Sequence, residues 1–115
     1  FTVVTNKKGI GEAGLIRALQ PLEGIELMKK RRETQNIYNF CSGPAKLVQA
    51  LAIKKKQNNH DLTKPPLSII LPDKKQKFKI VQTKRIGISR GESFSYRFYI
   101  LNNKFVSTNT HQKTI

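Results

Sequence analysis

The sequence predicts an α+β domain with mainly antiparallel strands, and three patterns support that class. The chain begins with a β-branched run, Phe1 to Thr5, which is typical of a strand. A later segment repeats apolar residues at helical spacing, namely Leu47, Val48, Leu51 and Ala52. Near the end, Tyr96 to Ile100 alternates as a strand does. The 115 residues suffice for one domain with a modest core, and no internal repeat divides them.

Two strands and a helix are expected in the first third of the chain. Ala13 to Leu19 follows a polar, glycine-containing turn and is apolar on both faces apart from Arg17, as expected of an interior strand. A turn with Pro21 ends this strand. Ile25 to Glu33 then predicts a short helix, because an acidic residue in its first turn and basic residues in its last complement the helix dipole.

A second helix is expected from Ser42 to Ile53. Ser42 is a favourable N-cap residue, and Gly43 and Pro44 fit the first turn, where the missing proline N–H does no harm. A polar loop should follow this helix. The remaining strands are expected at Leu67–Leu71, Phe78–Gln82, Tyr96–Ile100 and Phe105–Ser107, before a polar tail from Thr108. The alternation of the late aromatic residues predicts that they lie mainly in the core.

Positive charge is the strongest compositional signal. The chain has 22 Lys and Arg against 7 Asp and Glu, a formal net charge of +15, which favours an anionic partner such as nucleic acid. A membrane partner is not expected, because no stretch is apolar enough to span a bilayer and no helix pattern sets a broad apolar face against a basic one. Drift in an A+T-rich genome also explains part of the charge, since Lys, Asn and Ile are abundant together. We interpret the clusters Lys29–Arg32 and Lys74–Lys79 as solvated faces.

The cysteine content and the first residues of the chain indicate the cellular compartment in which we expect the protein. Cys41 is the only cysteine, so no internal disulfide can form, which fits a reducing environment. No signal-peptide pattern is visible, and we expect a cytoplasmic, nucleoid-associated bacterial protein. The sequence opens at Phe1 directly in a strand-like run, which suggests a fragment, an atypical start or half of a split gene.

Arg17 is the first candidate for chemistry. A guanidinium buried in an apolar strand is costly unless a carboxylate or a phosphate meets it. From the residues alone, a structural arginine paired with a backbone carbonyl or a core carboxylate is the simpler interpretation.

Two runs, Gly11–Gly24 and Cys41–Ile53, occur in an order that resembles the alkyladenine (3-methyladenine) DNA glycosylase family. The resemblance extends from Phe1 to about Ser107 and implies a mixed, mainly antiparallel sheet with flanking helices. It also implies that residues 1–107 are the C-terminal part of a single glycosylase domain, with residues 108–115 as a polar tail.

The family's motifs imply roles for particular residues of this chain. Arg17 would be catalytic, because its counterpart helps to organise a glutamate and the attacking water beside a flipped nucleotide. Thr2 and Leu15 would line the base pocket, with Thr2 standing where the family has asparagine, a departure that puts base selectivity in doubt. The implied contacts to the DNA backbone are Ser42, Gly43, Lys46, Lys54, Arg85 and Gly87.

The function implied by the resemblance is base-excision repair. Such an enzyme flips an alkylated purine such as 3-methyladenine out of double-stranded DNA and hydrolyses its N-glycosidic bond, with no metal or other cofactor. The family's general-base glutamate lies upstream of the matching segment. We therefore expect the isolated chain to excise nothing without a complementing N-terminal fragment. Apart from such a fragment, we expect the chain to be a monomer. The alternative is a non-catalytic basic protein that binds nucleic acid through charge alone.

Overall fold

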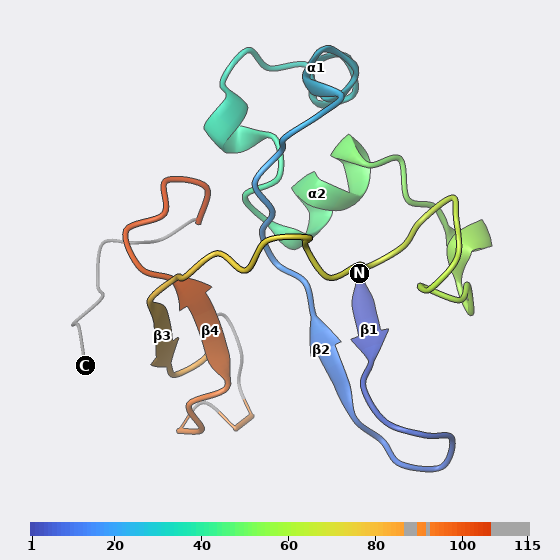
Figure 1. The fold of residues 1–115 in the computed structure, drawn as a ribbon, viewed down its shortest axis with the longest axis vertical. Helices are drawn as coiled ribbons and strands as arrows, with labels where there is room; N and C mark the ends of the chain where they lie inside the picture. The colour runs from blue at the N-terminus through green and yellow to red at the C-terminus, as the bar shows by residue number, and fades with distance from the viewer. Residues whose placement is uncertain (87–89, 92, 107–115) are drawn as a thin grey trace. The chain divides into compact units, whose positions relative to one another are not determined.

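The computed structural model describes residues 1–86, 90–91 and 93–106 of the chain. These residues form two compact units, Phe1–Ile70 and Leu71–Ile115, which we describe one at a time (Figure 1). Two α-helices and two small antiparallel sheets confirm the predicted α+β class. The predicted polar tail lies outside the described residues.

The first unit begins with a two-stranded antiparallel hairpin. Strand β1 (Thr2–Val4) pairs with strand β2 (Ala13–Leu15) (Figure 1). Val3 lies opposite Gly14 in this pairing. The prediction of an interior strand over Ala13–Leu19 is therefore wrong in length and in position. Within the described part of the chain, β2 has β1 as its one strand neighbour, and Ala13 and Leu15 on its outer face are exposed to solvent.

Helix α1 (Ile25–Arg32) matches the predicted helix to within one residue. It begins after Gly24, whose φ of +71° is a left-handed conformation that favours glycine. It ends at Glu33, which is also left-handed. The expected charge pattern is present, with Glu26 in the first turn and basic residues in the last.

Helix α2 (Pro44–Ala50) is shorter than predicted and starts later. The N-cap residue is Gly43 with extended backbone, so the prediction of Ser42 as N-cap is wrong. The Ser42 hydroxyl instead donates to Asn39 Oδ1 at 3.3 Å, within a buried turn. The core of this unit gathers around α2 and consists of Phe40, Cys41, Leu47 and Ala50. Burial raises the pKa of the Cys41 thiol.

Two arginines of the cluster Lys29–Arg32 join the ends of the two helices. Arg31 Nη1 donates to the carbonyl of Ala50, the last residue of α2, at 2.9 Å. Arg32 donates to the carbonyls of Asn39 and Phe40 and, through Nη1, to Gln49 Oε1 at 2.6 Å. Both side chains are half-buried, so the interpretation of this cluster as a solvated face is wrong for Arg31 and Arg32. They supply donors to carbonyls that the helix ends and the turn leave unpaired.

Replacing Arg32 by methionine tests this arrangement. The variant keeps the apolar stem but leaves two half-buried carbonyls without their donors, and we expect it to lower the free energy of unfolding by about 2 kcal/mol. Chemical denaturation followed by far-UV circular dichroism measures this, because α1 and α2 both lie in the first unit. The control is Lys30→Met on the exposed side of α1, expected to change stability by less than about 0.5 kcal/mol. Equal effects of the two variants would contradict the structural role of Arg32.

The rest of the first unit is short turns and loops. Two 3₁₀ helices, η1 (Ile37–Asn39) and η2 (Lys55–Gln57), flank α2 in the sequence. The predicted strand Leu67–Leu71 is absent, and Ile70 and Leu71 are 80% and 91% exposed. A strand needs a neighbour for its backbone groups, and this segment has no ladder partner within the described residues.

The second unit contains another antiparallel hairpin. Strand β3 (Ile80–Thr83) pairs with strand β4 (Arg97–Ile100) (Figure 1). Val81 lies opposite Tyr99 in this pairing, and both side chains are buried. The half-buried Arg97 lies over the Tyr99 ring at 4.4 Å.

Two sequence expectations for this unit fail. Phe105 and Val106 form a turn instead of the predicted strand, and Ser107 lies outside the described residues. The late aromatic residues are also not all in the core, since Tyr96 and Phe98 are 63% and 61% exposed. In a two-stranded hairpin one face can be covered while the other stays in water.

Among the described residues, no helix has the length and apolar character needed to cross a membrane.

Candidate nucleic-acid interface

The outer face of the β1–β2 hairpin brings together the two residues expected at a base pocket. Thr2 and Leu15 are direct partners in the strand register, so their side chains lie on the same face. Both are exposed, with 49% of Leu15 accessible to solvent. A hydroxyl and an apolar side chain thus stand side by side on an open surface.

Arg17 continues this face just beyond the end of β2. The Ile16 N–H donates to the Phe1 carbonyl at 2.9 Å, so the extended pairing runs one residue further, and side chains two positions apart share a face. Exposure alternates accordingly: Leu15 and Arg17 are exposed, and Ile16 between them is half-buried.

The expectation that Arg17 is buried is therefore wrong. The hairpin has two strands in the described structure, and its outer face is open. Within the described residues no hydrogen bond or ion pair holds the Arg17 guanidinium. It is free to receive a carboxylate or a phosphate from outside this unit.

The opposite face of the hairpin attaches this surface to the core. Phe1 and Ile16 pack against the buried cluster around α2. Two residues after Arg17, the Leu19 N–H donates to the Cys41 carbonyl at 3.1 Å. The position of Arg17 is thus set by contacts on both sides of it in the chain.

Glu12 is the carboxylate nearest to this face in sequence, but it is already occupied. It accepts hydrogen bonds from Thr5 Oγ1 at 2.8 Å and from Asn6 Nδ2 at 3.1 Å. These bonds, the one from Asn6 first, hold the pKa of Glu12 below its ordinary value. Glu12 precedes β2 and Arg17 follows it, so the two lie beyond opposite ends of the strand.

A second group of predicted residues is organised by Asn39. Its Oδ1 accepts from Ser42 Oγ and from Lys46 Nζ, the latter at 2.7 Å. The stem of Lys46 passes over Gly43, where an added Cβ would lie 3.6 Å from Lys46 Cδ. The three expected backbone contacts Ser42, Gly43 and Lys46 are therefore neighbours, and two of them already have a partner inside the protein.

The other expected contacts to the DNA backbone are dispersed along the chain. Lys54 is exposed and precedes η2. Arg85 belongs to the second unit, where its Nη2 donates to the Arg90 carbonyl at 3.0 Å. Gly87 lies outside the described residues. In the part of the chain that the structure describes, no group of three or more His, Cys, Asp or Glu side chains could hold a metal ion.

Sequence reasoning missed two features of these surfaces. Asn39 carries no motif of its own, and only the fold shows that it holds both Ser42 and Lys46. The exposed rings of Phe94 and Tyr96 were not assigned to any site from the sequence. The signal that could have found them is an aromatic pair two residues apart in a basic segment.

The hairpin has an open face with a free guanidinium, and the chain has a net charge of +15. These features are typical of a protein that binds an anionic partner. The chain belongs to the methylpurine-DNA glycosylase family, whose pattern matches residues 1–104. This confirms the resemblance noted in the sequence.

Three curated relatives, each provisionally named 3-methyladenine DNA glycosylase, show the extent of the similarity. A protein of Francisella tularensis is 51% identical over 110 residues, which is 93% of this chain and 57% of the relative. One from Carboxydothermus hydrogenoformans is 47% identical over 93% of this chain and 56% of its own length. One from Methanoculleus marisnigri is 42% identical over 91% and 56%. The chain thus spans a little over half the length of these relatives.

Proposed function

We propose that this chain forms one side of the active site of a DNA glycosylase that removes alkylated purines such as 3-methyladenine. The observation that carries the proposal is the outer face of the β1–β2 hairpin, where Thr2 and Leu15 are direct neighbours and Arg17 follows on the same side. Membership of the methylpurine-DNA glycosylase family and the names of the relatives support the same activity.

In the proposed reaction the damaged nucleotide rotates out of double-stranded DNA before its bond is cut. Water adds its hydroxyl to C1′ of the deoxyribose and gives its proton to the general base. The C1′–N bond breaks, and its electron pair stays with the positively charged alkylated purine, which leaves as the neutral base. Leu15 would contact the flipped purine, and Thr2 would border the pocket with a hydroxyl in place of the family's amide. The smaller Thr2 side chain should make the pocket roomier.

Arg17 would act on the carboxylate that activates the water. A guanidinium binds a carboxylate through two parallel hydrogen bonds, which fixes the orientation of both groups. Among the described residues, Glu12 and Asp61 accept hydrogen bonds from neighbouring side chains. Neither carboxylate forms a hydrogen bond or an ion pair with Arg17. The resemblance implies a general base upstream of the matching segment, so the proposal assigns it to a complementing segment outside these 115 residues.

Exposed cations would hold the phosphate backbone. Lys54 and Arg85 are exposed and can reach a phosphate without losing a buried contact. Lys46 can do so only by exchanging its hydrogen bond to Asn39. Such contacts position the duplex but carry no information about the damaged base.

A chimera tests the proposal. The segment of the Francisella relative that matches this chain is replaced by the chain itself, and release of 3-methyladenine from methylated duplex DNA is measured. We expect the chimera to release the base and the isolated chain to release none, because only the chimera contains a general base. Release by the isolated chain would contradict the missing base. An inactive chimera that folds would overturn the proposed activity.

The alternative is a basic protein that binds nucleic acid without catalysis, and the net charge of +15 is the observation that favours it. It predicts steep salt dependence, equal affinity for damaged and undamaged duplex, and an inactive chimera. The glycosylase proposal predicts a preference of the chimera for the damaged duplex at equal salt.

A further inference from the structure

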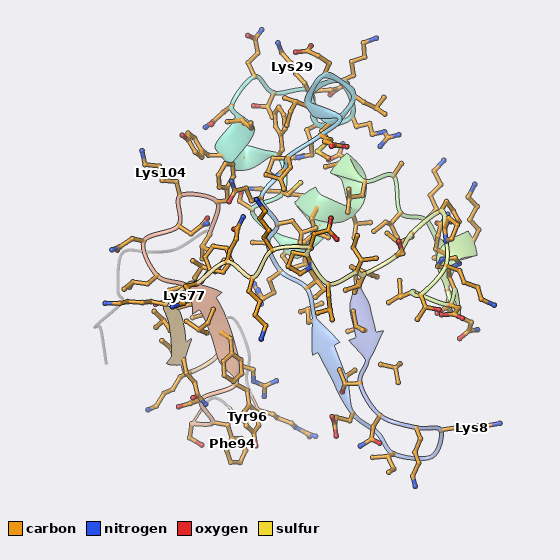
Figure 2. The ribbon with its side chains drawn as sticks, in the orientation of Figure 1. Lys8, Lys29, Lys77, Phe94, Tyr96 and Lys104 are labelled. Carbon is orange, nitrogen blue, oxygen red and sulfur yellow. The ribbon has the colours of Figure 1, made fainter. Side chains whose placement is uncertain are left out.

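The second unit carries an exposed aromatic pair at the end of its hairpin. The rings of Phe94 and Tyr96 stack with centroids 5.3 Å apart and an interplanar angle of 19°. More than half of each side chain remains exposed, 54% for Phe94 and 63% for Tyr96. Figure 2 shows the two labelled side chains together at the end of the hairpin, just before β4 begins.

Local backbone contacts hold the two rings in place. The Phe94 N–H donates to the Gly91 carbonyl at 3.1 Å, and the Tyr96 N–H donates to the Phe94 carbonyl at 3.0 Å. Gly91 has a φ of +67°, and a Cβ at this position would lie 2.6 Å from Arg85 Nη2 and 3.1 Å from Phe94 Cδ2. The missing side chain at Gly91 therefore lets the loop bring a guanidinium and an aromatic ring together.

Arg85 adds a fixed positive charge to the pair. Its guanidinium carbon lies 6.0 Å from the centre of the Tyr96 ring, and its Nη2 donates to the Arg90 carbonyl. Close to this group in the chain are two further exposed cations, Lys84 and Arg90. The other lysines of this unit, Lys74, Lys75, Lys77, Lys79 and Lys104, precede β3 or follow β4 and lie toward the other end of the hairpin, as the labelled Lys77 and Lys104 show (Figure 2).

We propose that Phe94, Tyr96 and Arg85 form a stacking site for an unpaired base of single-stranded DNA. An exposed stack of rings beside cations combines the two features that bind single strands, a π-face for the base and positive charge for the phosphates. The site deepens the proposed function, since removal of a base from the duplex leaves nucleotides unpaired.

The proposal is tested by comparing two single strands that differ only in their bases. The full chain is titrated into an oligothymidylate of about 15 nucleotides, and into an abasic sugar-phosphate strand of the same length, with fluorescence anisotropy as the readout. Because stacking is worth about 1–3 kcal/mol per base, we expect roughly five- to 150-fold tighter binding of the strand with bases. The double variant Phe94→Leu/Tyr96→Leu keeps apolar side chains without rings and should bind both strands with the affinity of the abasic one.

A matched control separates stacking from a general loss of structure. Phe98 is another exposed ring of this hairpin, with no ring contact in the described part of the chain, and Phe98→Leu should leave the preference for bases unchanged. Equal binding of the two strands by the unmodified chain would overturn the proposal, as would a double variant that keeps the preference. A double variant that changes only self-association in sedimentation would indicate a polypeptide partner and overturn it as well. None of these outcomes affects the chimera assay, so the proposed glycosylase function is judged separately.

Discussion

Replacing Arg17 by alanine in the chimera should reduce the rate of 3-methyladenine release by roughly 100-fold, because a misplaced catalytic group costs about that factor. Arg17 lies on the open face beside Leu15 and has no hydrogen bond within the described residues, so its removal leaves the hairpin unchanged. The loss should appear in the rate of single-turnover excision. The affinity for undamaged duplex should fall by no more than the loss of one phosphate contact would cause.

Two further variants make this result specific. Arg17→Lys keeps the charge but cannot reproduce the two-pronged contact with a carboxylate, so it should recover binding and little of the rate. Lys8→Ala removes an exposed cation from the turn of the same hairpin and should leave the rate unchanged (Figure 2). If Arg17→Ala excised 3-methyladenine at the unmodified rate, the assignment of Arg17 to the active site would be wrong.

Replacing Leu47 by alanine should produce the largest loss of stability. Leu47 is 0% exposed and packs with Phe40, Cys41 and Ala50 in the core of the first unit. The lost transfer energy and the cavity left behind together cost about 2–5 kcal/mol, which is a large share of the stability of a small domain. Denaturant unfolding of the isolated chain, followed by the helical signal of α1 and α2, measures the shift.

Leu22→Ala is the matched control for this experiment. Leu22 is 79% exposed in the same unit, and its truncation should change the free energy of unfolding by less than about 0.5 kcal/mol. A Leu47→Ala chain as stable as the Leu22→Ala chain would show that the cluster around α2 is not the core of this unit.

Much of the local structure was predictable from neighbouring residues. The first helix was predicted from its charge order. The second helix was predicted in its place, although its N-cap was expected at Ser42, one residue before Gly43. The strands β1, β3 and β4 were predicted within a residue or two, because β-branched and aromatic runs carry their own signal. The prediction of a strand at Leu67–Leu71 was wrong, because an apolar composition does not determine whether a neighbouring strand is there to pair with it.

The candidate site was predictable in its residue types and not in its arrangement. Thr2, Leu15 and Arg17 were selected by family resemblance, but their common face depends on the register that pairs Thr2 with Leu15. The contacts of Ser42 and Lys46 depend on Asn39, which carries no recognisable signal.

The amino-acid sequence alone was sufficient for the family, the α+β class and the strong positive charge. These properties depend on residue type and short-range spacing. Burial was decided only by the tertiary structure. Arg17 proved to be exposed, Arg32 half-buried and Tyr96 open to solvent, because the burial of a side chain depends on segments remote in sequence that cover it or leave it uncovered.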